Sequence, residues 1–326
     1  MERILVTGGG GFIGGHLAKY LSQQGHFVRV ADIKYDNYIQ EKYFDEKLLL
    51  DLRIYENCLT ATRGIDKIYN FAANMGGVGY ISSISADIMR DNILINTHML
   101  EASVNKKVKK YLFISSGSIY PSSLQAVPNI TGLKEEDAYP ANPNEPYGWE
   151  KLFAEEMVKA YQKDYGIDTG IVRYQNIYGP EETFRGGREK APAALCRKVI
   201  EAPDPGVLTI WGDGKSTRSF CYIDDCVKGT VALMESDFSQ PVNIGAYELS
   251  IDELADIIIN ISGKNITKSY DLSAPEGVKG RNADLTLARK VLGWEPQISM
   301  EEGIQQTYDW IKMMIGKEGN SGNQGA

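Results

Sequence analysis

The sequence predicts an α/β protein in which helices wind around both faces of a parallel sheet, with a smaller C-terminal α/β cap partly interleaved with the last sheet strands. Short apolar segments alternate with longer amphipathic ones through the first half of the chain. A glycine-rich turn follows the first apolar segment, and beyond about residue 180 the alternation becomes irregular. With 326 residues and 43% hydrophobic content, the chain can bury a sizeable core.

The predicted strands are short and rich in apolar and β-branched residues. They occupy residues 3–7, 27–32, 67–71, 110–115 and 168–173. Longer amphipathic stretches, such as residues 88–104, lie between them. This order is typical of a doubly wound, Rossmann-like parallel sheet.

Three parts are expected along the chain. Residues 1–180 should form mainly the sheet domain and residues 181–315 mainly the cap, where helices are predicted over 251–262 and 300–314. Glycine, asparagine, serine and glutamine dominate residues 316–326, which therefore predict an unstructured tail.

Charge and cysteine content narrow the possible partners. The net charge of -8 argues against nucleic acid but allows a local basic pocket for a small anion. The sequence shows no charged-then-apolar leader and no apolar run of membrane-spanning length, so we expect a cytoplasmic protein without a membrane partner. The four cysteines lack metal-ligand spacing, which predicts reduced, buried thiols and no metal site.

The glycine-rich turn has the spacing of a dinucleotide-binding loop. Gly8, Gly11 and Gly14 lie between the first predicted strand and a helix that Phe12 and Ile13 open. Such glycines allow a tight turn, bring backbone N–H groups to a pyrophosphate and let the helix pack on the sheet.

Asp32 ends the second predicted strand, at the distance from the glycines where a carboxylate binds the adenine ribose. Because a carboxylate there repels a 2′-phosphate, the sequence favours NAD over NADP. Arg29 and Lys34 are the opposing basic residues, and a strand-end cap is the alternative role for Asp32.

Tyr147 and Lys151 form a Tyr-x-x-x-Lys pair, which places both side chains on one face of a helix. A nearby ammonium and the cofactor ribose can lower the pKa of the phenol, so that the phenolate removes a hydroxyl proton. A solvated tyrosine beside a surface lysine is the alternative, and the glycine loop favours the catalytic role.

Residues 113–120 place three serines after the fourth predicted strand, where an open sheet has its ligand crevice. With the tyrosine and lysine, this arrangement resembles the extended short-chain dehydrogenase/reductase family from residue 1 to about residue 315. The resemblance implies a catalytic triad of Ser116, Tyr147 and Lys151. Turn capping is the alternative for a serine cluster read alone.

A finer resemblance connects the chain with the GDP-mannose 3,5-epimerase family. The matching stretches span nearly the whole chain and comprise residues 73–77, 173–180, 186–194, 211–214, 217–220 and 275–282. The resemblance implies a GDP-sugar substrate and a retained NAD. It also implies oxidation at C4 of the sugar, epimerisation at C3 and C5, and return of the hydride.

Epimerisation needs proton-transfer groups on both faces of the sugar. A ketone at C4 acidifies the hydrogens on C3 and C5, so bases of ordinary strength can remove them. In the family these groups are a lysine, which Lys190 matches, and a cysteine, whose position Ser118 occupies. A thiol with a pKa of about 8.5 exchanges protons near neutral pH, whereas an alcohol does so only with help, such as a bridging water.

Ser118 leaves several activities open. The chain could be a 3,5-epimerase variant, an enzyme acting on one centre, a C4 epimerase or dehydrogenase of a GDP-sugar, or a protein changed at this position to trap substrate. Gly117 and Ser118 stand where 4,6-dehydratases of the extended family carry Asp-Glu, which disfavours dehydration. A non-catalytic, NAD-responsive binding protein is a further alternative, which the retained Tyr147 and Lys151 disfavour.

The same resemblance implies a set of binding residues. Asp51 is the candidate adenine contact, with a strand-end cap as its alternative. Arg218, Arg281 and Lys198 would neutralise the diphosphate, although a surface ion pair accounts for each arginine equally well. The implied substrate-binding residues are Gly76, Ser116, Gly117, Ser118, Asn176, Glu189, Lys190, Ala191, Lys198, Ser216, Thr217, Arg218 and Arg281.

Family members usually form homodimers through a four-helix bundle, and the resemblance implies the same here. The helices around residues 88–104 and 149–165 would build it. Their apolar residues allow this packing, but such stripes also serve to pack a helix on its own sheet.

Overall fold

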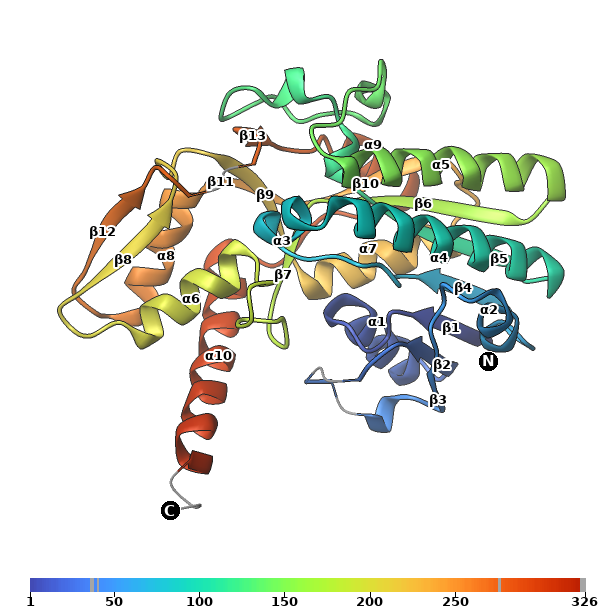
Figure 1. Ribbon diagram of the computed structural model, residues 1–326, viewed down its shortest axis with the longest axis horizontal. Coiled ribbons are helices and arrows are strands. Elements are labelled where there is room, and N and C mark those ends of the chain that lie inside the picture. The colour runs from blue at the N-terminus through green and yellow to red at the C-terminus, as the bar shows by residue number, and fades with distance from the viewer. Residues whose placement is uncertain (36–37, 40, 275–276, 323–326) are drawn as a thin grey trace.

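A computed structural model describes the chain except for residues 36–37, 40, 275–276 and 323–326. Its centre is a seven-stranded parallel sheet with the order β10-β6-β5-β4-β1-β2-β3 (Figure 1). The strands are β1 (Arg3–Thr7), β2 (Phe27–Asp32), β3 (Glu46–Leu49), β4 (Lys67–Asn70), β5 (Lys110–Ser116), β6 (Asp168–Tyr174) and β10 (Pro241–Ile244). The predicted α/β class and parallel sheet are confirmed.

Helices cover both faces of this sheet. On one face lie α2 (Tyr55–Ala61), α4 (Ser85–Asn105) and α5 (Pro146–Tyr165), and Figure 1 shows α4 and α5 side by side. The other face carries α1 (Phe12–Gln23) and α7 (Ile223–Glu235). Two separate buried cores result, because each face of the sheet presents its own set of apolar side chains.

The cap is built on a second, smaller sheet and a two-stranded ribbon. In the sheet, β9 (Thr217–Tyr222) pairs with β7 (Asn176–Tyr178), β11 (Tyr247–Ser250) and β13 (Gly280–Arg281). The ribbon consists of β8 (Gly206–Trp211) and β12 (Ile266–Asp271). The helices of this part are α6 (Ala191–Glu201), α8 (Ile251–Ser262), α9 (Thr286–Leu292) and α10 (Met300–Gly322). Since β10 lies in the main sheet, the C-terminal half of the chain contributes to both sheets.

The prediction that structure ends at residue 316 is wrong for residues 316–322. The last helix, α10, continues to Gly322, while residues 323–326 lie outside the described residues. Met314 and Ile315 pack against the core, and Glu318 lies 3.4 Å from Arg185. These contacts and the good helix formers Lys317 and Glu318 extend the helix past the expected end.

The carboxyl ends of the central strands meet at one edge of the sheet. Thr7 at the end of β1 lies beside Asn70 of β4, and Ser116 at the end of β5 lies beside Tyr174 of β6. Open α/β sheets bind their ligands at this edge. The glycine turn and the serine segment both begin there.

None of the described helices is long and apolar enough to cross a membrane. In the same part of the chain, no group of three or more His, Cys, Asp or Glu side chains is placed to hold a metal ion.

Candidate active site

The glycine turn leaves room that side chains would fill. Gly8 has a φ of +67°, and a Cβ at Gly14 would lie 2.3 Å from the carbonyl oxygen of Gly8. Helix α1 therefore packs closely on the turn, and its N-terminus carries no capping side chain. Backbone N–H groups at such a helix start can bind a pyrophosphate, so these residues fit NAD.

Asp32 lies at the end of β2, as predicted, and its carboxylate accepts hydrogen bonds from the turn. The N–H of Gly10 donates to Oδ2 at 2.9 Å, and the N–H of Ile33 donates to Oδ1 at 2.7 Å. Burial raises the pKa of Asp32, and these backbone donors oppose the rise. The two roles considered for Asp32 are compatible, because a carboxylate has lone pairs for both the turn and a ribose hydroxyl.

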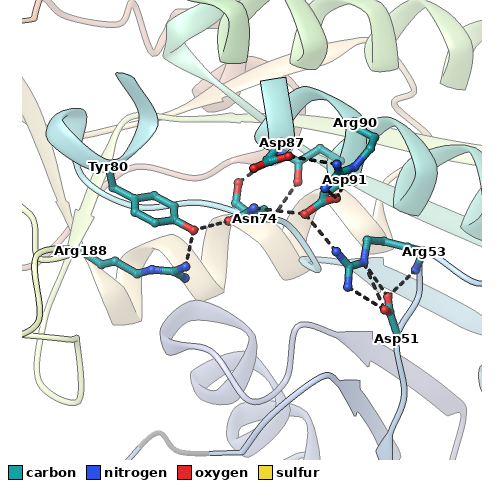
Figure 2. A network of polar contacts seen from close by, with 9 residues as sticks. Asp51, Arg53, Asn74, Tyr80, Asp87, Arg90, Asp91 and Arg188 are labelled. Atoms are coloured by element: carbon teal, nitrogen blue, oxygen red, sulfur yellow. Dashed lines mark hydrogen bonds and ion pairs between the residues drawn. The ribbon is translucent and has the colours of Figure 1, made fainter. Parts of the chain in front are cut away.

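Asp51 lies near Asp32 at the same edge of the sheet. It follows β3, and Leu49 at the end of β3 pairs with Asp32 of β2. Arg53 donates to both carboxylate oxygens of Asp51, with Nη2 to Oδ2 at 2.7 Å (Figure 2). These bonds lower the pKa of Asp51. An adenine contact by Asp51 stays a prediction.

The predicted triad converges at the end of β5. Tyr147 is 5% exposed and Lys151 4% exposed, both on α5, and the side chain of Ser116 lies close enough to the phenol to lower its pKa. Burial raises the pKa of Tyr147, the charge of Glu150 raises it further, and Ser116 and Arg281 lower it. In the chain alone, the expected fall in the phenol pKa is therefore not seen. The ammonium of Lys151 lies 5.7 Å from the centre of the tyrosine ring.

Ser118 is fixed between two elements of the site. Nη1 of Arg281 donates to its hydroxyl oxygen at 3.1 Å, and Nε of Arg281 donates to Gln125 at 2.9 Å. A Cβ at Gly148 would lie 2.2 Å from the carbonyl oxygen of Ser118, so α5 contacts the serine segment directly. Because Arg281 occupies a lone pair of the Ser118 oxygen, the hydroxyl hydrogen can point to another acceptor.

Strand β9 brings several predicted binding residues of the cap together. Its Arg218 pairs in register with Arg281 of β13, and Asn176 of β7 donates to the carbonyl of Ser219 at 3.2 Å. Two arginines paired in register on adjacent strands suit a diphosphate. The hydroxyl of Thr217 is already bonded to Glu248 at 2.8 Å and accepts from Asn129 at 2.9 Å. Ser216 directly precedes β9.

The remaining predicted residues lie in the loop between β7 and α6 and around it. Lys190 immediately precedes α6, which begins at Ala191, and Oε2 of Glu189 accepts from the N–H of Gly187 at 2.6 Å. Lys198 of α6 donates to the carbonyl of Thr209 in β8 at 3.0 Å, which ties its ammonium to the two-stranded ribbon. Gly76 lies under the ring of Tyr80, and Gly117 lies against the side chain of Gln175.

The structure adds a buried polar cluster that the sequence did not reveal. Glu150 is fully buried, and its carboxylate accepts from Asn96 at 2.8 Å and from Asn92 at 3.3 Å. Its Oε2 also lies 3.9 Å from the ammonium of Lys151. Asn92 and Asn96 lie four residues apart in α4, and this helical spacing of two amides was a readable signal.

Comparisons with known proteins agree with this arrangement. The model of the NAD dependent epimerase/dehydratase family matches residues 4–245. The chain is 46% identical over 322 residues to GDP-mannose 3,5-epimerase 1 of Oryza sativa subsp. japonica, covering 98% of this chain and 84% of the relative. It is 45% identical over 323 residues to GDP-mannose 3,5-epimerase of Arabidopsis thaliana, covering 98% and 85%.

A solved structure shares the fold over nearly the whole chain. It is the UDP-glucuronic acid 4-epimerase of Bacillus cereus in complex with UDP-glucuronic acid and NAD. The two chains are 29% identical, with a TM-score of 0.82, and the match covers 96% of this chain and 99% of the other. The fold of this chain therefore recurs in a protein that was solved with NAD and a nucleotide sugar.

Proposed function

The chain belongs to the NAD dependent epimerase/dehydratase family, and from that premise we propose that it is a GDP-sugar epimerase acting as a variant of GDP-mannose 3,5-epimerase. The observation that carries the proposal is the meeting of the buried Tyr147 and Lys151 with Ser116 at the sheet edge. The identity to two GDP-mannose 3,5-epimerases over nearly the full chain supports the choice of sugar nucleotide.

The residues of the glycine turn would hold NAD, with Gly8, Gly11 and Gly14 at the pyrophosphate and Asp32 at the adenine ribose. Phe12 and Ile13 open helix α1, whose N-terminus would face the phosphates of a bound NAD. A bound NAD would supply the redox chemistry at C4 of the sugar, as the acceptor of a hydride and later its donor.

Tyr147 would remove the proton of the C4 hydroxyl as the hydride leaves that carbon. Ser116 positions the sugar oxygen, and the ammonium of Lys151 stabilises negative charge on the phenol. Since burial raises the pKa of Tyr147, the phenol keeps its proton in the chain alone. Positive charge close to the ring must therefore accompany substrate oxidation, and Arg281 already supplies some of it.

Lys190 would transfer protons at C3 and C5 once the C4 ketone has acidified those hydrogens. A base takes the proton from carbon, negative charge moves onto the ketone oxygen, and a proton returns to the opposite face. Arg218 and Arg281 would bind the diphosphate, and Asn176 and Glu189 would orient sugar hydroxyls.

Ser118 would act on the second face of the sugar through a hydrogen bond or a bound water. The guanidinium of Arg281 donates to its oxygen and so stabilises negative charge on it. An alcohol remains a much weaker acid than a thiol, so proton transfer at this face should be slower than a cysteine would make it.

Ser118 also favours a second candidate, a C4 epimerase or C4 dehydrogenase of a GDP-sugar. Such an enzyme uses Ser116, Tyr147 and Lys151 but needs no acid at position 118. Its product would be inverted at C4, or it would leave NADH in solution.

Assembly and compartment are proposed on separate observations. Trp149 and Phe153 of α5 are 44% and 55% exposed, which supports a homodimer formed through α4 and α5. Cys58, Cys196, Cys221 and Cys226 are all free and buried, which supports a reducing compartment such as the cytoplasm.

Incubation of the NAD-loaded protein with GDP-mannose, followed by proton NMR of the sugar, tests the proposed function. A product inverted at C5, with or without inversion at C3, is expected. Inversion at C4 alone would replace the proposal with the second candidate. No turnover of GDP-mannose would remove this sugar as the substrate.

A further inference from the structure

The loop that carries Glu189 and Lys190 rests on the segment that follows β4. The N–H of Gly77 donates to the carbonyl of Arg188 at 3.2 Å. A Cβ at Gly77 would lie 2.8 Å from the carbonyl oxygen of Glu189, so only glycine allows this close approach of the two backbones. The position of Lys190 therefore depends on how this contact is held.

A side-chain pair spans the same contact. The guanidinium of Arg188 lies 4.0 Å from the centre of the Tyr80 ring and donates to the Tyr80 hydroxyl. The Tyr80 side chain also packs against Gly76, where a Cβ would lie 2.7 Å from Tyr80 Cδ1. Tyr80 lies in α3 (Val78–Ser83), the short helix before α4.

The Tyr80 hydroxyl is bonded in turn to a fixed acceptor. It donates to Oδ1 of Asn74 at 2.8 Å, as Figure 2 shows. Asn74 is held by Asp91, which accepts from its Nδ2 at 3.2 Å, and by Asn92, which accepts from its backbone N–H at 2.7 Å. Asn74 thus has little freedom to move.

From Asn74 the contacts lead to the helix of the catalytic pair. Asn92 donates to both the carbonyl of Asn74 and the carboxylate of Glu150, each at 3.3 Å. Glu150 lies between Tyr147 and Lys151 in α5. A continuous series of hydrogen bonds therefore joins Arg188, two residues before Lys190, to the residue beside Lys151.

We propose that Tyr80 and Arg188 are positioning residues that hold Lys190 in register with the sugar bound at Tyr147 and Lys151. The assignment rests on the proposed function, because it concerns proton transfer at C3 and C5. Neither side chain needs to touch the sugar. The Tyr80 hydroxyl is hydrogen-bonded to both Asn74 and Arg188, and the Tyr80 ring contacts the Arg188 guanidinium. Arg188 directly precedes Glu189 and Lys190 in the chain.

The test uses Tyr80→Phe and Arg188→Lys in the full-length, NAD-loaded protein. Tyr80→Phe keeps the ring under the guanidinium but removes both hydrogen bonds, and Arg188→Lys keeps the charge but loses the planar contact. Arg185→Lys is the matched control, because Arg185 lies in the same loop and pairs instead with Glu201 and Glu318.

Two kinetic signals are measured with GDP-mannose in deuterated buffer. Each variant should lower deuterium incorporation at C3 and C5 about tenfold, the size expected for one or two lost hydrogen bonds. First-turnover absorbance at the NADH band should stay within about twofold of wild type. The double variant should incorporate as much deuterium as the poorer single variant, because both changes remove the same contact between Tyr80 and Arg188. Equal loss of both signals, or additive losses, would overturn the proposal.

Hydrogen–deuterium exchange of the ligand-free protein tests, independently of catalysis, whether these side chains hold the Lys190 loop against the segment that follows β4. Tyr80→Phe and Arg188→Lys should speed exchange in peptides covering residues 76–83, and Arg185→Lys should not. Unchanged exchange would overturn the proposal. If wild type incorporates no deuterium into the sugar, the proposed epimerisation fails together with the role in proton transfer, while this measurement still reports on the seating alone.

Discussion

The region proposed for hydride transfer and the region proposed for proton transfer are held in different ways. Tyr147 and Lys151 lie on a long helix, almost fully buried, beside a carboxylate held by two asparagines. Ser118 lies in a single 3-10 turn. Lys190 lies just before helix α6, at the end of a loop in which Arg185 and Arg188 are exposed. Regular structure therefore fixes the first region, whereas a few side-chain contacts fix the second. We therefore expect that substitutions in the second region will change epimerisation without disturbing oxidation.

Each region buries an acid whose pKa is raised by burial, but the two acids differ in their hydrogen bonds. Glu150 in the first is fully buried and accepts two amide hydrogen bonds. Glu182 in the second is 5% exposed, and its Oε2 has no hydrogen-bond partner among the described residues. Burial raises the pKa of Glu182 to about 7, and the charge of Lys190 opposes the rise. The loop before Lys190 thus holds a poorly compensated acid.

The largest effect is expected for Tyr147→Phe. Removing the group proposed to take the C4 proton should slow hydride transfer by about 10⁴-fold. Deuterium incorporation at C3 and C5 should disappear as well, because it requires the C4 ketone. Stopped-flow absorbance at the NADH band and NMR of the sugar measure the two effects. Deuterium incorporation without hydride transfer would show that the two regions are not used in this order.

Lys190→Gln should separate the regions. Deuterium incorporation should fall by about 10³-fold, because a neutral amide can neither take nor give the proton. First-turnover NADH absorbance should stay within about twofold of wild type. Lys159→Gln, a change on the outer part of α5, is the control. Loss of both signals in Lys190→Gln would contradict the division.

Glu182→Gln should stabilise the protein as the pH rises. A raised carboxyl pKa means that Glu182 contributes full stability below about pH 4.5, and that this contribution is lost as the pH rises through about 7. Between about pH 4.5 and pH 7, the free energy of unfolding of the variant should therefore rise relative to that of wild type, by up to about 3 kcal/mol. Denaturant titrations at pH 5 and pH 8.5 measure the gain. A gain that is the same at both values would contradict the burial of an unpaired acid.

Glu150→Gln sharpens the contrast between the two acids. Both carboxylate oxygens of Glu150 accept hydrogen bonds from side-chain amides. A glutamine would replace one of these oxygens with an NH₂ group, which would face the N–H donor of Asn92 or Asn96. We expect a loss of stability of about 1–3 kcal/mol at pH 8.5, in the same titrations, where Glu182→Gln gains. Stabilisation by Glu150→Gln would show that the two acids are not held differently.

Ser118→Cys should give the smallest change. A thiol with an ordinary pKa of about 8.5 ionises far more readily than a hydroxyl, so deuterium incorporation should rise, by about tenfold near that pH. Hydride transfer should not change, because the proposed oxidation uses Ser116, Tyr147 and Lys151 and not Ser118. Ser122→Cys, in the next turn of the same segment, is the control. A fall in deuterium incorporation would indicate that the hydroxyl is itself needed.

Much of the fold followed from local patterns. β1, β2 and α8 have the predicted bounds, because each combines a clear apolar period with a distinct boundary. β3 escaped prediction since it is an edge strand whose residues are at most half-buried and include Glu46 and Lys47. The tail was judged by composition alone, which ignores the packing that extends α10.

The site was predictable only where its residues are close in sequence. Tyr147 and Lys151 are four residues apart, and the three glycines lie in one turn. The contact of Asn92 with Glu150 joins residues 58 apart, and that of Tyr80 with Arg188 joins residues 108 apart. Such pairs depend on how α3, α4 and the cap pack together. The rise in the Tyr147 pKa likewise depends on burial, which no spacing reveals.

The central claim is that this chain oxidises GDP-mannose at C4 with one region and exchanges protons at C3 or C5 with the other. Its most direct test is incubation of the wild-type protein with GDP-mannose in deuterated buffer, with NMR of the sugar and NADH absorbance recorded on the same sample. We expect deuterium at C3 or C5 and no lasting NADH signal. A 4-keto sugar or accumulating NADH without deuterium would contradict the claim.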